Sequence, residues 1–365
     1  MIASGNETLR TRPVGAGGTP CQGAPLPADD LKHILVHTAE LLRELDGKRI
    51  FITGGTGFFG IWLLETIAYA NDQLGICVSA TVLSRDPQAF LARMPHLAKR
   101  GEFGWVLGHP TSFAFPNTPN DYLLHLATAT SAHLGTTDAA VMLKTKLASI
   151  SHVLDFARHA GIRRMLVTSS GAIYGPQPRE LSHIPETYTG APDPLDPVSA
   201  YGNGKRLVEQ MCALAPDVEI VIARCFSFIG PHLPLDARFA AGNFIRDALA
   251  GGPIKIKGDG SPVRSYLYAA DLTIWLITLL LKGRASQAYN VGSDAAVNLA
   301  ELAQSVARVA GGMVVDIAKP RSDGSAERYV PAIDKVRTEL GLDVRVALES
   351  ALERSLAWAG SPDTP

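Results

Sequence analysis

Short apolar runs alternate with longer amphipathic stretches through the first two thirds of the chain. Runs of strand length lie at residues 49–53, 76–83, 104–107, 122–126, 164–168 and 219–223. The spacing of apolar residues predicts helices before and between them, most clearly at 29–45, 138–160 and 200–214. Because parallel strands need a crossover about as long as a helix, this alternation predicts an α/β fold of the Rossmann type, with a doubly wound parallel sheet.

The rhythm changes after residue 225, where short strands, proline turns and separated helices follow one another. We therefore expect a flexible N-terminal tail over 1–28 and a Rossmann domain with a leading helix over 29–225. Residues 226–358 are expected to form mainly a smaller α/β substrate lobe, with segments that return to the Rossmann domain. A cleft between that lobe and the carboxyl edge of the sheet is the expected ligand site.

The longest apolar run, Leu272–Leu281, is about half the length needed to cross a bilayer and predicts a buried helix. The first twenty residues lack the apolar segment of a signal peptide, so we expect no membrane association and a cytoplasmic location. A net charge of -1 offers no electrostatic basis for binding nucleic acid. The four cysteines contain no C-x-x-C pair, which predicts reduced thiols and no metal site.

The most informative segment joins the first apolar run to a helix through the glycine-rich sequence TGGTGFFG, residues 53–60. Gly54 permits a tight turn, Gly57 lets the backbone approach a diphosphate, and Gly60 lets the helix pack closely on the strand. Three glycines alone could be only a turn, but a strand before and a helix after favour a dinucleotide site at the helix N-terminus. Thr56, Phe58 and Phe59 lie in the same loop and are further candidate cofactor contacts.

A second candidate site is the pair Tyr201 and Lys205, whose spacing of four places both side chains on one face of a helix. A nearby ammonium favours the phenolate, so the tyrosine could exchange a proton with a substrate hydroxyl. Ser170 ends another apolar run and could hydrogen-bond the same oxygen. Taken singly, these residues could equally be a surface pair and a serine that completes a strand end.

Together these segments resemble the extended short-chain dehydrogenase/reductase family, specifically its nucleotide-sugar epimerases, dehydratases and reductases, from about Lys48 to Trp358. The resemblance implies that Ser170, Tyr201 and Lys205 are catalytic, and that Tyr201 and Lys205 also contact the cofactor. His125-Leu126-Ala127 is similar to the family's H-x-A segment, so Leu126 and Ala127 are expected at the cofactor. Ser227 stands where this family usually has asparagine in R-x-x-N-x-x-G-P.

The same resemblance implies a nucleotide-diphosphate sugar as substrate, and we expect a homodimer. Arg264 follows Gly258-Asp259-Gly260 in a segment similar to the one whose arginine binds the diphosphate. A guanidinium can hold a phosphate through two hydrogen bonds without a broad basic surface. Asn243 and Arg328 are further candidates for substrate binding, alongside Ser170.

Departures from the family pattern separate the possible reactions. Where 4,6-dehydratases carry an Asp-Glu pair after the catalytic threonine, this chain has Gly171 and Ala172, and the glutamate of the decarboxylases is also absent. Neither residue can move a proton, which favours hydride and proton exchange at one sugar carbon, as in an epimerase or a 4-keto reductase of polysaccharide synthesis. A dehydratase-like or decarboxylase enzyme and a non-catalytic NADP-binding sensor remain the alternatives.

The cofactor preference depends on the end of the second apolar run, where NAD-using members commonly have an aspartate. This chain has Ser84 and Arg85, and an arginine there can pair with a 2′-phosphate, so NADP is favoured over NAD. The alternative is an arginine that stacks on adenine in an NAD enzyme. His109 stands where the family usually has an aspartate against the adenine, and the sequence assigns it no role.

Overall fold

A seven-stranded parallel sheet forms the centre of the molecule. The computed structural model describes residues 23–127, 136–235, 239–320 and 326–361. The strands lie in the order β11-β6-β5-β4-β1-β2-β3, and every neighbouring pair is parallel. They are β1 (Arg49–Thr53), β2 (Ser79–Ser84), β3 (Phe103–Leu107), β4 (Tyr122–His125), β5 (Arg164–Ser170), β6 (Glu219–Cys225) and β11 (Gln287–Val291).

The strand order reverses between β1 and β4, which confirms the predicted doubly wound sheet. The six apolar runs became strands, and β11, from the C-terminal part of the chain, adds a seventh beside β6. The second strand begins later than predicted, at Ser79. The reason is local, because the N–H groups of Cys77 and Val78 donate to the side chains of Asp46 and Asn71.

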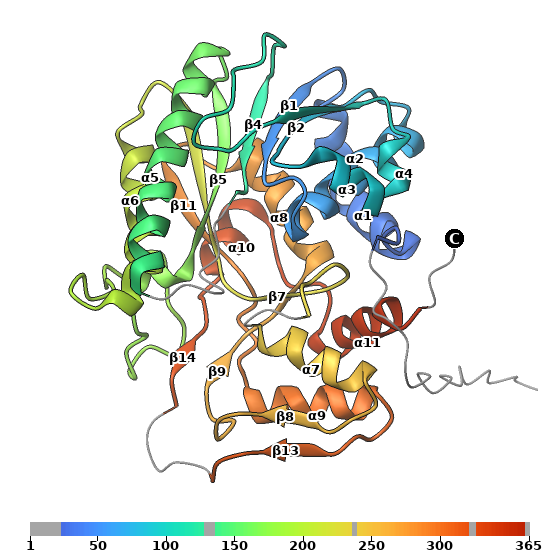
Figure 1. Cartoon of the computed structure of the whole chain (residues 1–365), viewed down its shortest axis with the longest axis vertical. Coiled ribbons are helices and arrows are strands. Elements are labelled where there is room, and N and C mark those ends of the chain that lie inside the picture. Colours follow the sequence, from blue (N-terminus) through green and yellow to red (C-terminus); the bar gives the residue numbers. More distant parts are fainter. Residues whose placement is uncertain (1–22, 128–135, 236–238, 321–325, 362–365) are drawn as a thin grey trace, which may run out of the picture.

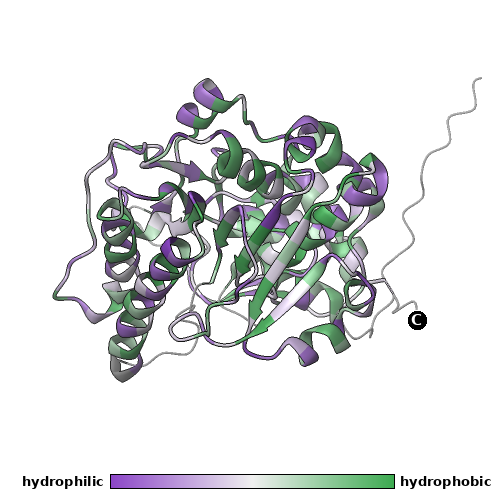
Figure 2. Cartoon of the chain, turned by 90° about the horizontal axis from the view of Figure 1, so that it is seen from above, coloured by the Kyte–Doolittle hydropathy of each residue, from purple (hydrophilic) through white to green (hydrophobic). Residues whose placement is uncertain are grey.

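Helices cover both faces of the sheet (Figure 1). On one face α5 (Thr136–His159) packs beside α6 (Ala200–Ala213). On the other, α1 (Ala28–Glu44), α2 (Phe58–Leu74) and α8 (Ala269–Lys282) pack together, while α3 (Pro87–Arg93) and α4 (Pro95–Ala98) lie near the β3 edge. Figure 2 shows hydrophobic residues concentrated on the strands and on the helix faces turned toward them. Burial of apolar side chains on both sheet faces therefore organises this layer.

A smaller lobe lies below the sheet in Figure 1. Its helices are α7 (Ala240–Leu249), α9 (Leu299–Val309) and α11 (Leu348–Ala359), with α10 (Asp334–Leu340) near β11. Its short strands pair as β7 with β10, as β8 with β13, and as β12, β9 and β14 in that order. Their bounds are β7 (Phe228–Ile229), β8 (Ile254–Ile256), β9 (Val263–Arg264), β10 (Leu267–Tyr268), β12 (Val297–Asn298), β13 (Val315–Ile317) and β14 (Arg328–Tyr329).

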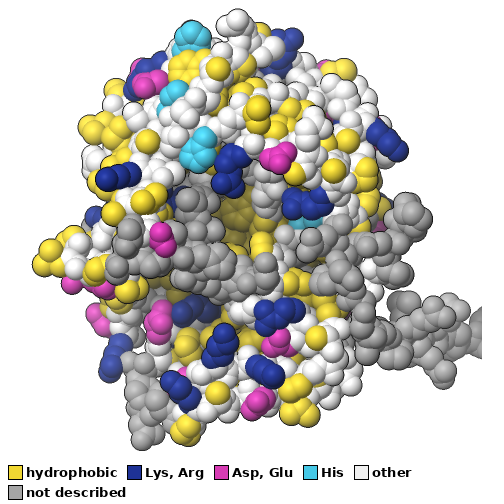
Figure 3. Space-filling view, in the orientation of Figure 1, with side chains coloured by type: hydrophobic (Ala, Val, Ile, Leu, Met, Phe, Trp, Pro, Cys, Tyr) yellow, Lys and Arg dark blue, Asp and Glu magenta, His cyan; other side chains and the backbone are white. Residues whose placement is uncertain are grey.

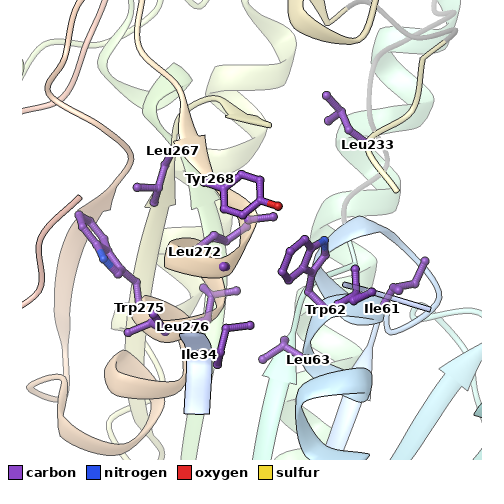
Figure 4. Packing of buried hydrophobic residues seen from close by; sticks show 14 of the residues in the cluster. Ile34, Ile61, Trp62, Leu63, Leu233, Leu267, Tyr268, Leu272, Trp275 and Leu276 are labelled. Carbon is purple, nitrogen blue, oxygen red and sulfur yellow. The ribbon is translucent and has the colours of Figure 1, made fainter. Parts of the chain in front are cut away.

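The apolar run at 272–281 lies inside α8 and is buried, as its length predicted. Figure 4 shows Leu272 and Leu276 of this helix near Trp62 of α2 and Ile34 of α1. The rings of Trp62 and Tyr268 meet edge to face, with centroids 5.8 Å apart. Among the helices that the structure describes, none is long and apolar enough to cross a membrane.

The segment that leads into α1 is anchored at its described end. Leu26 is buried, and its N–H donates to Glu65 Oε2 of α2 over 2.7 Å. Asp30 in the first turn of α1 accepts hydrogen bonds from Tyr268 and, over 2.7 Å, from Arg354 of α11. These contacts connect the leading helix to both the sheet layer and the lobe.

Candidate active site

The glycine loop lies where the strand order reverses, at the carboxyl ends of β1 and β4. Gly54 has φ +74°, and a Cβ built on it would lie 2.7 Å from the backbone nitrogen of Ala127. A Cβ on Gly60 would lie 2.3 Å from the backbone of Gly55. Gly57 precedes α2 without a side-chain cap, so the first N–H groups of the helix, at Phe58 and Phe59, are available to an anion.

A cavity of about 300 Å³ opens beside this loop. Its lining includes Arg85, Lys146 and Lys205, and none of the residues described around it is Asp or Glu. The space-filling view in Figure 3 shows a hollow near the middle of the molecule, with Lys and Arg side chains around it. A backbone cradle that side chains would fill, together with local positive charge, fits the diphosphate of a dinucleotide. The cavity is lined by Gly54, Thr56, Gly57, Leu83, Ser84, Arg85, Gly108, His109, Pro110, His125, Leu126, Ala127, Thr145, Lys146, Ser149, Lys205 and Val208.

The end of the cavity near β2 carries the residues expected at the adenosine. Ser84 is buried, and its Oγ accepts a hydrogen bond from the N–H of Asp86. The carboxylate of Asp86 in turn accepts from the N–H of Ala89 over 2.9 Å and so caps α3. The nearest acid after β2 is thus engaged by the helix, while the exposed Arg85 lines the cavity. His109 also lines it, and its Nδ1 lies 2.8 Å from the hydroxyl of Thr111.

Tyr201, Lys205 and Ser170 come together at the carboxyl ends of β4 and β5. Lys205 is 4% exposed, and its Nζ donates to the carbonyl oxygen of Thr168 over 2.6 Å. The hydroxyl of Ser170 lies close enough to that of Tyr201 to lower the pKa of the phenol. The structure therefore brings together the three residues that the sequence proposed as catalytic.

Burial governs the protonation of this cluster. It raises the pKa of Tyr201 to about 12, while the nearby hydroxyl of Ser170 acts in the opposite direction and lowers it. Burial also lowers the pKa of Lys205 to about 8. His125 at the end of β4 has its pKa lowered to about 3 by burial and by Lys205 and Lys146, so it is neutral at physiological pH. Its Nδ1 lies 2.8 Å from the hydroxyl of Thr53.

Tyr329 of β14 connects this cluster to the lobe. Its hydroxyl lies 3.4 Å from Ser170 Oγ, and the Arg264 guanidinium lies 5.9 Å from the centre of its ring. Arg264 of β9 donates to Glu327 Oε1 over 2.8 Å. The candidate diphosphate-binding arginine therefore lies on the same side as the candidate catalytic residues but is paired with a carboxylate.

The other two substrate candidates, Asn243 and Arg328, are engaged by other partners. Asn243 of α7 accepts a hydrogen bond from Arg246 of the same helix over 3.0 Å. Arg328 is next to Tyr329 on β14 and donates to the carbonyl oxygen of Ser182. Its Nε is buried and has no hydrogen-bond partner among the described residues. Among the described residues, neither Asn243 nor Arg328 is hydrogen-bonded to Arg264.

The places of the dehydratase acid and base are filled differently here. A Cβ on Gly171 would lie 2.6 Å from Phe226 Cζ and 2.8 Å from the hydroxyl of Tyr329. The rings of Phe226 and Tyr329 pack with centroids 4.6 Å apart. An aspartate at position 171 would therefore require both rings to move.

Two residues near Tyr201 were missed in the sequence. Lys146 of α5 lies with its ammonium 4.5 Å from the centre of the Tyr201 ring, and Tyr329 lies against Ser170. Lys146 could have been found, because it follows Met142 by four residues and precedes Ile150 by four, on the buried stripe of α5. No local pattern marks Tyr329, whose position depends on how the lobe folds back.

Comparison with known proteins places the chain in one family. The model for the NAD dependent epimerase/dehydratase family matches residues 50–292. UDP-glucuronic acid decarboxylase 1 of Xenopus tropicalis is 28% identical over 332 residues, which cover 87% of this chain and 74% of that protein. UDP-glucuronic acid decarboxylase 3 of Arabidopsis thaliana is 28% identical over 316 residues, covering 83% and 86%.

Solved structures show the same fold. UDP-glucose 4-epimerase of Thermotoga maritima has a TM-score of 0.71 at 21% identity, covering 85% of this chain and 98% of its own. The dTDP-glucose 4,6-dehydratase DesIV of Streptomyces venezuelae has a TM-score of 0.72 at 23% identity, covering 85% and 96%. The family match extends from the glycine loop through Ser170, Tyr201 and Lys205 and includes β11. The chain therefore belongs to the NAD-dependent epimerase/dehydratase family of nucleotide-sugar enzymes.

Proposed function

We propose that this protein moves a hydride and a proton at a single carbon of a nucleotide-linked sugar, as a 4-epimerase or a 4-keto reductase. One observation carries the proposal. Ser170, Tyr201 and Lys205 lie together in a cluster, while Gly171 and Ala172 beside it offer no acid or base. Such a cluster is sufficient for alcohol–ketone interconversion but not for removal of water.

Each residue then has a defined task. Tyr201 takes the proton of the sugar hydroxyl during oxidation or returns it during reduction, and Ser170 hydrogen-bonds the same oxygen. Lys205 lowers the cost of the phenolate by its positive charge. The nicotinamide dinucleotide supplies or accepts the hydride. Arg264, with Arg328 and Asn243 as further candidates, would bind the diphosphate of the substrate.

Decarboxylation of a nucleotide-linked uronic acid is the second candidate, because the curated relatives named above are UDP-glucuronic acid decarboxylases. Those relatives are 28% identical, and the side chains at 171 and 172 cannot carry a proton. The crowding of Gly171 by Phe226 and Tyr329 also argues against a dehydratase-like reaction. We therefore rank both below single-carbon chemistry.

The experiment is a turnover assay on the purified protein with a panel of nucleotide sugars and their 4-keto forms. Interconversion of 4-epimers by a protein that retains its cofactor through gel filtration supports an epimerase. Stoichiometric consumption of added NADPH supports a reductase. Release of carbon dioxide from UDP-glucuronate would overturn both in favour of the decarboxylase, and binding without turnover would leave a non-catalytic sensor.

We further propose that NADP is preferred over NAD, because Arg85 lines the cavity and the carboxylate of Asp86 is engaged at the start of α3. Arg85→Ala should weaken NADPH binding at least tenfold, or about 1.4 kcal/mol, and barely change NADH binding. Tryptophan-quenching titrations measure both affinities. Lys99→Ala, an exposed change elsewhere on the surface, is the control, and equal or tighter binding of NADH by the wild type would contradict the preference.

The homodimer, the cytoplasmic location and a role in polysaccharide synthesis stay predictions. Light scattering on the purified protein, cell fractionation, and the surface glycans of a deletion strain test them in turn.

A further inference from the structure

Lys146 lies inside the catalytic cluster although the proposed chemistry does not call on it. It is 6% exposed, it belongs to α5, and it lines the same cavity as the glycine loop and Lys205. Its ammonium lies over the face of the Tyr201 ring, 4.5 Å from the centre. A cation in that position is attracted by the electron-rich face of the ring, and more strongly once the ring is a phenolate.

The neighbouring helix leaves room for this lysine. A Cβ on Gly204 of α6 would lie 2.9 Å from Lys146 Cδ and 3.0 Å from Leu143 Cδ2. Any larger residue at 204 would therefore compete with the stem of Lys146. Gly204 separates Tyr201 from Lys205 in the sequence, so the same short segment of α6 carries both catalytic side chains and the gap that admits a second lysine.

Among the described residues, the titratable groups known to act on Lys146 are positive or neutral. From α6 it faces the phenol of Tyr201 and the ammonium of Lys205, and from the end of β4 the neutral His125. Burial and, to a lesser extent, the like charge of Lys205 together lower the pKa of Lys146 to about 7. Lys205 itself is also in the field of Glu209, Cys212 and Cys225.

We propose that Lys146 is a positioning residue for Tyr201 and the second cation of the site, holding the ring and stabilising its phenolate together with Lys205. The proposal rests on the proposed function, since it assigns Lys146 a role in proton exchange at Tyr201. If Lys146 has this role, binding of the dinucleotide is coupled to uptake of a proton by the protein. An anionic diphosphate in the shared cavity favours the charged form of this lysine.

The sign follows from the two lysine pKa values. The pKa is about 7 for Lys146 and about 8 for Lys205. At a pH between these two values and before the dinucleotide binds, Lys146 is mostly neutral and Lys205 is mostly charged. Binding of the dinucleotide raises the pKa of Lys146, so protons are taken up chiefly by Lys146 in this window. Below the window both lysines are already charged, and the uptake disappears.

Calorimetric titration with NADPH alone, at about pH 7.5 in two buffers of different protonation enthalpy, measures this uptake. We expect the wild type to take up roughly half a proton or more per NADPH, and Lys146→Met or Lys146→Gln to lose most of it. Lys144→Met, an exposed change on the same helix, should keep the wild-type value. Equal uptake in the wild type and the Lys146 variants would overturn the proposal, whichever sugar the enzyme uses.

A second readout is the pH dependence of sugar turnover. In the wild type the first proton lost from the cluster belongs chiefly to Lys146, whereas in Lys146→Met it belongs to Lys205. On the acidic side of the pH–rate profile for sugar oxidation, the apparent pKa should therefore rise by about one unit in Lys146→Met, from near 7 toward 8. In Lys144→Met the same apparent pKa should keep its wild-type value. An unchanged apparent pKa in Lys146→Met would show that Lys146 does not act on Tyr201. If the Lys146 variants lose proton uptake but the wild type turns over no sugar, only the proposed reaction is refuted.

Discussion

Replacing Tyr201 by phenylalanine should reduce turnover roughly 100-fold or more while leaving the fold and the dinucleotide affinity nearly unchanged. A positioned acid or base contributes about that factor, which corresponds to about 2.7 kcal/mol of transition-state stabilisation. The ring would still pack under Lys146, because the phenyl group keeps the face that the ammonium contacts. Only the phenol oxygen, which lies near the hydroxyl of Ser170, is lost.

The measurement is the steady-state rate on the accepted nucleotide sugar, with melting temperature and dinucleotide affinity measured beside it. Tyr122→Phe is a matched control, because Tyr122 is the first residue of β4 and so lies at the opposite edge of the sheet from the cavity. Its rate should equal that of the wild type. Near-normal turnover in a folded Tyr201→Phe protein would remove this residue from the mechanism.

Arg264→Ala should weaken binding of the nucleoside diphosphate by about 2 kcal/mol, or roughly 30-fold, since hydrogen bonds between charged groups contribute about 1.5–3 kcal/mol each. The guanidinium must first leave Glu327, whose side chain is 68% exposed. Such exposed pairs contribute only about 0–1 kcal/mol, so the phosphate should win the competition.

Isothermal titration with the nucleoside diphosphate tests this prediction. Glu327→Gln should bind the same ligand as well as the wild type or a few-fold more tightly, because the competing carboxylate is gone. Arg308→Ala changes an exposed arginine of α9 in the same lobe and should have no effect. Unchanged affinity in Arg264→Ala would place the diphosphate elsewhere.

Much of the site could be predicted because its residues are close together in the sequence. The glycine loop spans residues 53–60, so the strand, the turn and the helix start that form it are all local. Tyr201 and Lys205 share one helix face through their spacing alone. Ser170 could be placed near them because carboxyl ends of parallel strands meet at one edge.

Residues brought in by distant segments could not be placed in this way. Tyr329 reaches Ser170 from β14, 159 positions along the chain, and the partnership depends on how the lobe packs. The same holds for Glu327, which accepts a hydrogen bond from Arg264 although the two residues are 63 positions apart in the chain. Lys146 gave a weak signal, a lysine on an apolar stripe, but which group it faced depended on the packing of α5 against α6.

The sequence by itself determined the class of fold, the dinucleotide loop and the three catalytic candidates, because hydrophobic periodicity and short spacings are local properties of the chain. Tertiary structure alone decided which charges share the cavity, which carboxylates are already engaged, and how little space surrounds Gly171. Those features depend on side chains from different elements meeting in a desolvated space. Burial there sets the pKa values of Tyr201, Lys205 and Lys146, and no spacing along the chain encodes it.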